Sequence, residues 1–208
     1  MVKVHYIFDP MCGWCFGATS LMAELAHHPE IELLLHPGGM MQRAPISVDF
    51  RQHILQADQR ITAQTGQAFG EAYLKRVSSG APLILDSYQT AQAIIAAEQV
   101  GIAAFEMLKA IQKAHYIDGK LVASEETLSE LALQLGADQD AWQQAMQAAS
   151  SKVDSQVANT RRLMEQYGQG GFPSLLVEQQ GQMRSVRPSD FYGQSQRWKS
   201  FWQQVVNH

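Results

Sequence analysis

The sequence predicts an α/β protein in which both chain ends build one small mixed sheet and the middle forms a large all-helical insertion. Three observations predict this class. Residues 2–8 alternate between apolar and other side chains, as in a strand. Residues 31–36 form a short apolar run suited to a buried parallel strand, and the segment between has helical spacing. The β pattern returns at residues 173–186, after a long stretch of helical pattern.

The N-terminal part predicts a strand–helix–strand unit. Its first strand should stop at Asp9-Pro10, a pair that favours a turn. Apolar residues then recur at helical steps, at Cys15, Ala18, Leu21, Met22, Leu25 and Ala26. This helix should end near Pro29, because proline cannot continue a helix. The crossover to the parallel strand at residues 31–36 should be right-handed.

The central part predicts a series of helices with recognisable caps and stops. Gly38-Gly39 ends the strand pattern, and Ser47 can cap a helix that stops at Gly66. Asp86 and Ser124 can cap later helices in the same way. The expected helices cover approximately residues 48–65, 69–77, 86–101, 102–115, 124–136, 138–150 and 151–168.

The C-terminal part predicts a hairpin followed by a helix. Residues 173–178 and 182–186 should pair as strands around a turn at 179–181. Pro188 suits a helix start, and the apolar stripe of that helix comprises Trp198, Phe201, Trp202 and Val205. We therefore expect residues 1–39 and 151–208 to form a sheet domain, with residues 40–150 inserted as a helical domain.

Composition argues against several classes of partner. The net charge is −4 and the apolar fraction is 46%, so neither a nucleic acid nor an anionic membrane is expected as a partner. No apolar run reaches membrane-spanning length. The first residues lack the pattern of a signal peptide, which favours a cytoplasmic location.

Both cysteines of the chain, Cys12 and Cys15, lie three residues apart just after the first strand. Cys12 should lie at the start of the following helix and Cys15 one turn inside it, on the same side. A helix N-terminus favours an anion, which should lower the pKa of Cys12. In a reducing compartment such a pair is rarely a structural bridge, and the context indicates a thiol–disulfide redox site.

Other interpretations of these residues are open at this point. Two cysteines could be half of a zinc site, but tetrahedral zinc needs about four ligands. The histidines are scattered, at positions 5, 27, 28, 36, 53, 115 and 208, so we expect neither a metal nor a cofactor. Trp14 should be partly exposed beside the reactive sulfur, although it could also be an ordinary core residue.

Three segments resemble the DsbA-like superfamily of the thioredoxin fold, and within it the FrnE-like cytoplasmic branch. They are residues 8–17 (FDPMCGWCFG), residues 38–40 (GGM) and residues 171–174 (GFPS). The resemblance implies a thiol–disulfide oxidoreductase or disulfide isomerase, with Pro173 as the family's cis-proline facing the cysteines. Trp14, Phe172 and Pro173 are the implied substrate-binding residues. The dipeptide Gly13-Trp14 lacks the histidine of strongly oxidising periplasmic DsbA, so a strong oxidase is not implied.

The predicted chemistry is thiol–disulfide exchange without a cofactor. The Cys12 thiolate attacks a disulfide, and Cys15 resolves the mixed disulfide that results. The expected partners are protein or peptide thiols and disulfides, and glutathione, while the oligomeric state is left open. One alternative is a glutathione-dependent transferase or isomerase on the same fold, although such relatives usually carry serine at the position of Cys12. Another is a non-catalytic chaperone or binding module.

Overall fold

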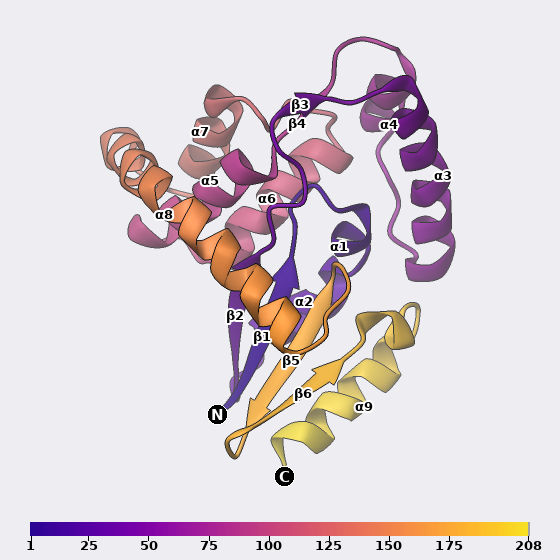
Figure 1. Cartoon of the computed structure of the whole chain (residues 1–208), viewed down its shortest axis with the longest axis vertical. Helices are drawn as coiled ribbons and strands as arrows, with labels where there is room; N and C mark the ends of the chain where they lie inside the picture. The colour runs from indigo at the N-terminus through magenta and orange to yellow at the C-terminus, as the bar shows by residue number, and fades with distance from the viewer. Residues whose placement is uncertain (208) are drawn as a thin grey trace.

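The computed structural model describes residues 1–207, and its main sheet carries helices on both faces (Figure 1). Within these residues the sheet has four strands in the order β2-β1-β5-β6. They are β1 (Val2–Phe8), β2 (Ile31–Pro37), β5 (Ser174–Gln179) and β6 (Gln182–Val186). β1 is parallel to β2 and antiparallel to β5, which forms the predicted hairpin with β6. The predicted mixed sheet from both chain ends is therefore confirmed.

The helix that carries the cysteines is broken in two. α1 (Gly13–Gly17) ends at Ala18, where α2 (Thr19–Ala26) begins, so the expectation of one continuous helix is wrong. The Thr19 hydroxyl donates a hydrogen bond to the Phe16 carbonyl at 2.7 Å. Such local side-chain bonds compete with the backbone ladder, which explains the break. α2 still returns the chain to β2 and completes the predicted strand–helix–strand unit.

The insertion follows the predicted order of helices. It contains α3 (Val48–Thr65), α4 (Glu71–Ser78), α5 (Ser87–Gln99), α6 (Ala104–Tyr116) and α7 (Glu125–Gln134). The Ser47 hydroxyl accepts from the Phe50 amide at 3.2 Å, and the Asp86 carboxylate caps α5, as expected. A two-stranded sheet of β3 (Ala44–Pro45) and β4 (Ile84–Leu85) was not predicted, because two residues are too few to show a period.

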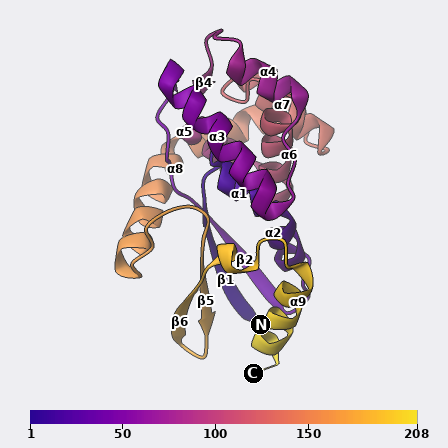
Figure 2. The same cartoon turned by 90° about the vertical axis from the view of Figure 1, so that its right-hand side faces the viewer.

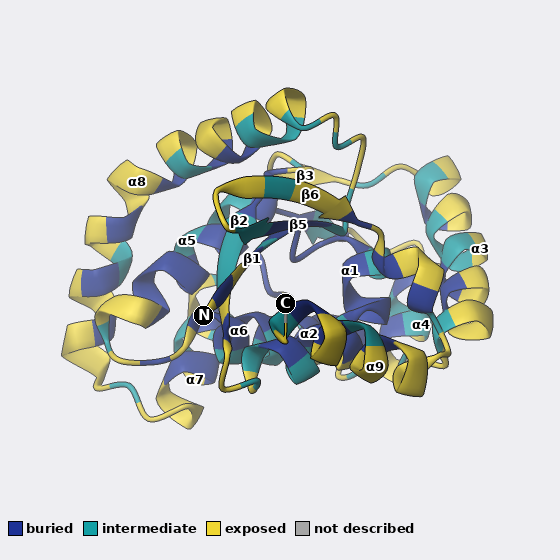
Figure 3. Cartoon of the chain, turned by 90° about the horizontal axis from the view of Figure 1, so that it is seen from below, coloured by how far each residue is buried: buried dark blue, intermediate teal, exposed yellow. Residues whose placement is uncertain are grey.

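The last helix of the insertion is a single long one, α8 (Gln139–Gln166). The two helices expected at residues 138–150 and 151–168 are therefore one. No glycine or proline lies between them, and the Ser150 and Ser151 hydroxyls bond back to carbonyls of their own helix. The expected domain boundary at residue 150 falls within α8, and the division into two domains remains a prediction. α8 lies across one face of the sheet, beside β2 (Figure 3).

The opposite face of the sheet is covered by α2 and the C-terminal helix α9 (Ser195–Val206), as Figure 3 shows. The expectation that the last helix begins at Pro188 is wrong. Pro188 instead starts a short 3₁₀ helix, η1 (Pro188–Phe191), and α9 begins only at Ser195. The predicted stripe of α9 does face the core, with Phe201 half-buried and the rest buried. The Trp198 indole donates to the Leu21 carbonyl at 3.0 Å and ties α9 to α2.

The helices of the insertion approach the cysteine-bearing helix at the end of β1. α1 starts there, and α3 packs against α1 from the insertion side (Figure 2). Any chemistry of the cysteines therefore takes place where α1 and α3 meet.

In residues 1–207 no helix has the length and apolar character needed to span a membrane.

Candidate active site

Cys12 and Cys15 lie at the start of α1, as predicted. Cys12 is the N-cap residue, and its carbonyl accepts from the Cys15 amide at 3.0 Å. Both thiols are unbridged in this structure. Cys12 is 7% exposed, whereas Cys15 is completely buried. A disulfide substrate would therefore meet Cys12 first.

The two thiols have opposite electrostatic environments. The pKa of Cys12 is lowered, above all by a hydrogen bond from the Cys15 thiol and then by backbone N–H groups of Cys15 and Trp14, while burial opposes the shift. Burial, followed by the interaction with Cys12, raises the pKa of Cys15 well above its usual value. The backbone N–H groups of the helix N-terminus thus lower the pKa of Cys12 as expected, but the hydrogen bond from the Cys15 thiol lowers it more.

The predicted proline loop lies beside Cys12. The Phe172–Pro173 peptide bond is cis, as the resemblance implied. The Cys12 thiol points at the Phe172 carbonyl, with 3.7 Å between sulfur and oxygen. The Phe172 ring fills the space over Gly38, where a Cβ atom would lie 2.1 Å from ring carbons. Gly38 therefore allows the loop to lie close to the end of β2.

Trp14 lies on the outer side of the cysteine pair. It is half-buried and stacks on Tyr192, with ring centroids 5.8 Å apart. Both rings line an open hollow of about 510 Å³, here called the proline groove. Its other lining residues are Gln64, Gly168–Ser174, Ser185 and Arg187–Ser189. All three predicted substrate-binding residues, Trp14, Phe172 and Pro173, thus line one groove.

Asp9 is a site residue that the sequence interpretation missed. It is completely buried, and its carboxylate accepts from the Met11 amide (2.9 Å), the Met40 amide (2.6 Å) and the Ser87 hydroxyl (2.7 Å). Burial raises the pKa of Asp9, and these hydrogen bonds oppose the rise. The Asp9 charge in turn raises the pKa of both cysteines. The Asp9-Pro10 pair predicts only the end of a strand, so the effect of the Asp9 charge on the pKa of the cysteines is not predicted from the sequence.

A second cavity lies on the insertion side of Cys12. It has a volume of about 230 Å³ and is here called the insertion pocket. Its polar lining residues include Asp58 and Tyr73, which come from α3 and α4. Cys12 and Trp14 line it as well, and Trp14 also lines the proline groove.

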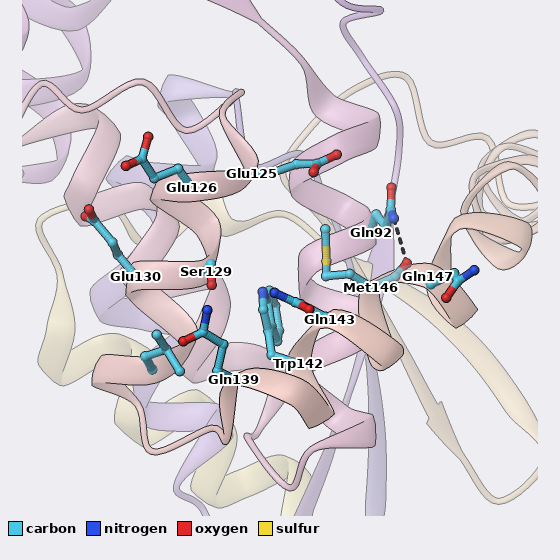
Figure 4. Close-up of a pocket in the computed structure, with 11 residues that line it drawn as sticks. Gln92, Glu125, Glu126, Ser129, Glu130, Gln139, Trp142, Gln143, Met146 and Gln147 are labelled. Carbon is cyan, nitrogen blue, oxygen red and sulfur yellow. Dashed lines mark hydrogen bonds between the residues drawn. The ribbon is translucent and has the colours of Figure 1, made fainter.

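A hollow of about 730 Å³ lies away from the cysteines, between α7, α8 and Gln92 of α5. Figure 4 shows three glutamates of α7 on one side of it and the Gln92 amide bonded to the Met146 carbonyl. No cysteine or histidine of the described part of the chain lines it. Among residues 1–207 no cluster of three or more His, Cys, Asp or Glu side chains could hold a metal ion. The arrangement at Cys12 and Cys15 thus remains the candidate centre for chemistry.

Known proteins share the fold of this chain. Residues 3–194 match the family model described as a DSBA-like thioredoxin domain. A search of curated protein sequences finds no significant match. Among solved structures, the cytosolic disulfide reductase DsbM from Pseudomonas aeruginosa is 32% identical, with a TM-score of 0.92 and coverage of 99% of this chain and 98% of that one.

Two further structures extend the comparison. The same DsbM with GSH matches at 31% identity and a TM-score of 0.90, covering 99% of this chain and 100% of that one. A 2-hydroxychromene-2-carboxylate isomerase matches at 14% identity and a TM-score of 0.60, covering 99% and 98%, which shows a shared fold alone. The chain therefore belongs to the DSBA-like thioredoxin domain family and is a thiol–disulfide oxidoreductase.

Proposed function

We propose that this protein reduces disulfides through Cys12 as nucleophile and Cys15 as resolving thiol. The observation that carries the proposal is the asymmetry of the pair. Cys12 lies at the helix start with a lowered pKa, and Cys15 lies completely buried behind it with a raised pKa. The thiolate is the attacking form, so the more acidic and more accessible thiol should attack first.

The steps follow ordinary exchange chemistry. The Cys12 thiolate attacks one sulfur of the substrate, which breaks the substrate disulfide, releases one thiolate and leaves a mixed disulfide on Cys12. Cys15 then loses its proton and attacks the Cys12 sulfur, which releases the second thiolate. The substrate gains two electrons, and the protein is left with a Cys12–Cys15 disulfide. This chemistry requires no cofactor.

Two molecules of a thiol such as glutathione would return the protein to its reduced form, themselves becoming a disulfide. The similarity to a cytosolic disulfide reductase that has a structure with GSH supports this donor and a cytosolic location. The cytosolic glutathione pool also favours the reductive direction. The net charge of −4 supports neither a nucleic acid nor an anionic membrane as a partner.

The proposed docking site for a peptide substrate is the proline groove. The Phe172 carbonyl lies 3.7 Å from the Cys12 sulfur, so an extended chain paired with that loop would bring its own cysteine to the thiolate. Trp14 and Pro173 line the same groove and would contact the side chains that flank this cysteine. Backbone pairing would allow substrates of many sequences.

An insulin reduction assay with glutathione as donor tests this proposal. The parent protein should accelerate reduction, and Cys12→Ser should return it to the uncatalysed rate. Incubated with a protein disulfide in the absence of added thiol, Cys15→Ala should accumulate a mixed disulfide on Cys12, detected by mass spectrometry, because no second thiol releases the product. Full activity in Cys12→Ser would contradict the proposal, whereas a parent protein that does not accelerate reduction would favour a binding module. Glutathione conjugation without disulfide reduction would favour the transferase alternative.

A further inference from the structure

The insertion pocket contains one carboxyl group close to the redox dipeptide. Asp58 of α3 is 4% exposed, and its Oδ2 accepts from the Tyr73 hydroxyl at 3.0 Å. Its Oδ1 lies toward α1, because a Cβ atom on Gly13 would lie 3.3 Å from it. Cys12 lines the same cavity. A small group held at Asp58 would therefore lie within a cavity that the attacking residue Cys12 also lines.

Within the described part of the chain, the Asp58 carboxyl has no cationic partner. Among residues 1–207, the ion pairs include none with Asp58, and its hydrogen-bond partner is Tyr73. Burial raises its pKa to about 6, with the Tyr73 hydrogen bond opposing, so it is ionised at neutral pH. A buried charge without a counter-ion destabilises a protein, and a bound cation would relieve that cost.

The rest of the lining supports an occupant with an apolar stem and a charged tip. The apolar wall consists of Met11, Met40, Phe50, Ile54, Ala57, Ile61, Val77, Leu83 and Leu85. Aliphatic stems of basic side chains pack well on such surfaces while their tips find a polar partner. The other titratable groups around the pocket are Cys12, His53, Arg60, Tyr73, His115 and Tyr116. Of these, the basic His53 and Arg60 side chains are exposed, whereas His115 is buried and its pKa is lowered to about 4.

We propose that the insertion pocket is a specificity site for a positively charged group near the substrate disulfide, with Asp58 as the residue that binds it. An ammonium or guanidinium group would pair with Asp58 while the adjacent sulfur is attacked by Cys12. A carboxylate in the same place would face Asp58 and be rejected. This inference rests on the proposed function, because it assumes that Cys12 is the nucleophile.

Three small symmetric disulfides that differ in their end groups test the inference. They are cystamine (cationic), bis(2-hydroxyethyl) disulfide (neutral) and 3,3′-dithiodipropionate (anionic). The rate constant for oxidation of the reduced protein is measured for each at neutral pH, in the parent and in Asp58→Asn. The asparagine keeps the size of Asp58 and an acceptor for Tyr73. The quantity compared is the ratio of cystamine to the neutral disulfide, because a change in Cys12 reactivity affects both and cancels.

The ratio should fall by about tenfold or more in Asp58→Asn, as expected for loss of a charged hydrogen bond. Asp49→Asn is the matched control, since Asp49 is an exposed residue of the same helix and its loss changes the net charge equally. Its ratio should stay near that of the parent. In the parent, the ratio should also fall as the pH drops below the pKa of Asp58, about 6.

An unchanged ratio in Asp58→Asn, with the neutral disulfide still consumed, would overturn the inference and leave the proposed function standing. An equal fall in Asp49→Asn would also overturn it, because general attraction would then explain the preference. If the parent reacts with none of the three disulfides, this result would instead contradict the proposed function.

Discussion

The Ser87 hydroxyl donates a hydrogen bond of 2.7 Å to the buried carboxylate of Asp9, across 78 positions of the sequence. This bond joins the end of β1 to the start of α5. The Ser87 hydroxyl also accepts from the Met41 amide at 3.0 Å, and Asp9 accepts from the Met40 amide. Asp9 thus fixes the entry into the insertion directly beneath the cysteine pair.

Asp9→Asn should lower the pKa of Cys12 and make the Cys12–Cys15 disulfide more oxidising. The negative charge of Asp9 raises the pKa of both thiols, so its removal stabilises the thiolate of the reduced protein. The rate of alkylation of Cys12 as a function of pH measures the first effect, and equilibration with glutathione measures the second. The alkylation profile should move to lower pH.

Ser87→Ala is the control for this prediction, because it removes a hydrogen bond to Asp9 and keeps the charge. It should lower the free energy of unfolding by about 1–3 kcal/mol and leave the alkylation profile in place. Equal shifts of the profile in Ser87→Ala and Asp9→Asn would mean that the structure of the site, and not the charge of Asp9, sets the acidity of Cys12.

Gly38→Ala should disturb both stability and reactivity. The added Cβ atom would lie 2.1 Å from the Phe172 ring, so the ring and its loop must move away from β2. Overpacking of this kind costs about 1–3 kcal/mol. Movement of the loop also displaces the Phe172 carbonyl from Cys12. Urea denaturation and the rate of reaction with bis(2-hydroxyethyl) disulfide measure the two effects.

Gly170→Ala provides the comparison for Gly38→Ala. Gly170 is an exposed residue of the same loop, and a Cβ atom there would have no neighbour within 4 Å. Its stability should remain close to that of the parent. A Gly38→Ala protein as stable as Gly170→Ala and as reactive as the parent would show that close packing of Phe172 on Gly38 is unimportant.

The half-buried His36 and the buried His115 predict a loss of stability in acid. Burial lowers the pKa of His36 and of His115 from 6.5 to about 4, helped by the charges of His5 and Arg76 respectively. The unfolded chain therefore binds these protons first as the pH falls. The free energy of unfolding should decrease from pH 6.5 toward pH 4, by at most about 3 kcal/mol per histidine, and level off below.

The urea midpoint as a function of pH measures this effect, and His36→Gln should flatten the slope. Asp58 works in the opposite direction, because its folded pKa of about 6 lies above its ordinary value of 3.8. The folded protein binds that proton first, which adds stability as the pH falls through this range. Asp58→Asn should therefore steepen the acid loss. An identical slope in His36→Gln and the parent would contradict the assignment to His36.

The parts of the fold that the sequence predicted are those with local causes. The strand before Cys12, the caps at Ser47 and Asp86, and the hairpin around Gln180-Gly181 each depend on a few neighbouring residues. In the hairpin turn both residues have positive φ, 52° and 75°, which a glycine at the second position favours. Such signals can be interpreted without knowing the tertiary structure.

The parts that the sequence did not predict depend on contacts between distant segments. Ser87 reaches Asp9 from the insertion, and Asp58 reaches Gly13 from α3, so neither is visible in the residues around the cysteines. The continuity of α8 was missed for a different reason. Serines at its centre resemble a helix start, yet here their hydroxyls bond back within the helix.

Ile61→Val should rescue Gly13→Ala but not Gly17→Ala. α3 packs on α1 at these two glycines through different atoms of Ile61. A Cβ atom on Gly13 would lie 3.0 Å from Cδ1, which valine lacks, whereas one on Gly17 would lie 2.7 Å from Cγ2, which valine keeps. Valine and isoleucine also share one preferred χ1 rotamer in a helix, so Cγ2 should stay in place.

Each single glycine variant should lose about 1–3 kcal/mol through overpacking, and Ile61→Val alone about 0.5–1.5 kcal/mol. The double variant Ile61→Val with Gly13→Ala should then lose clearly less free energy of unfolding than its two single variants lose together. In the double variant Ile61→Val with Gly17→Ala, the two losses should add. Urea denaturation of the parent and these five variants completes both cycles. Equal coupling in the two pairs would mean that α3 shifts as a whole, and that the individual atoms of Ile61 do not determine how closely it approaches the cysteine helix.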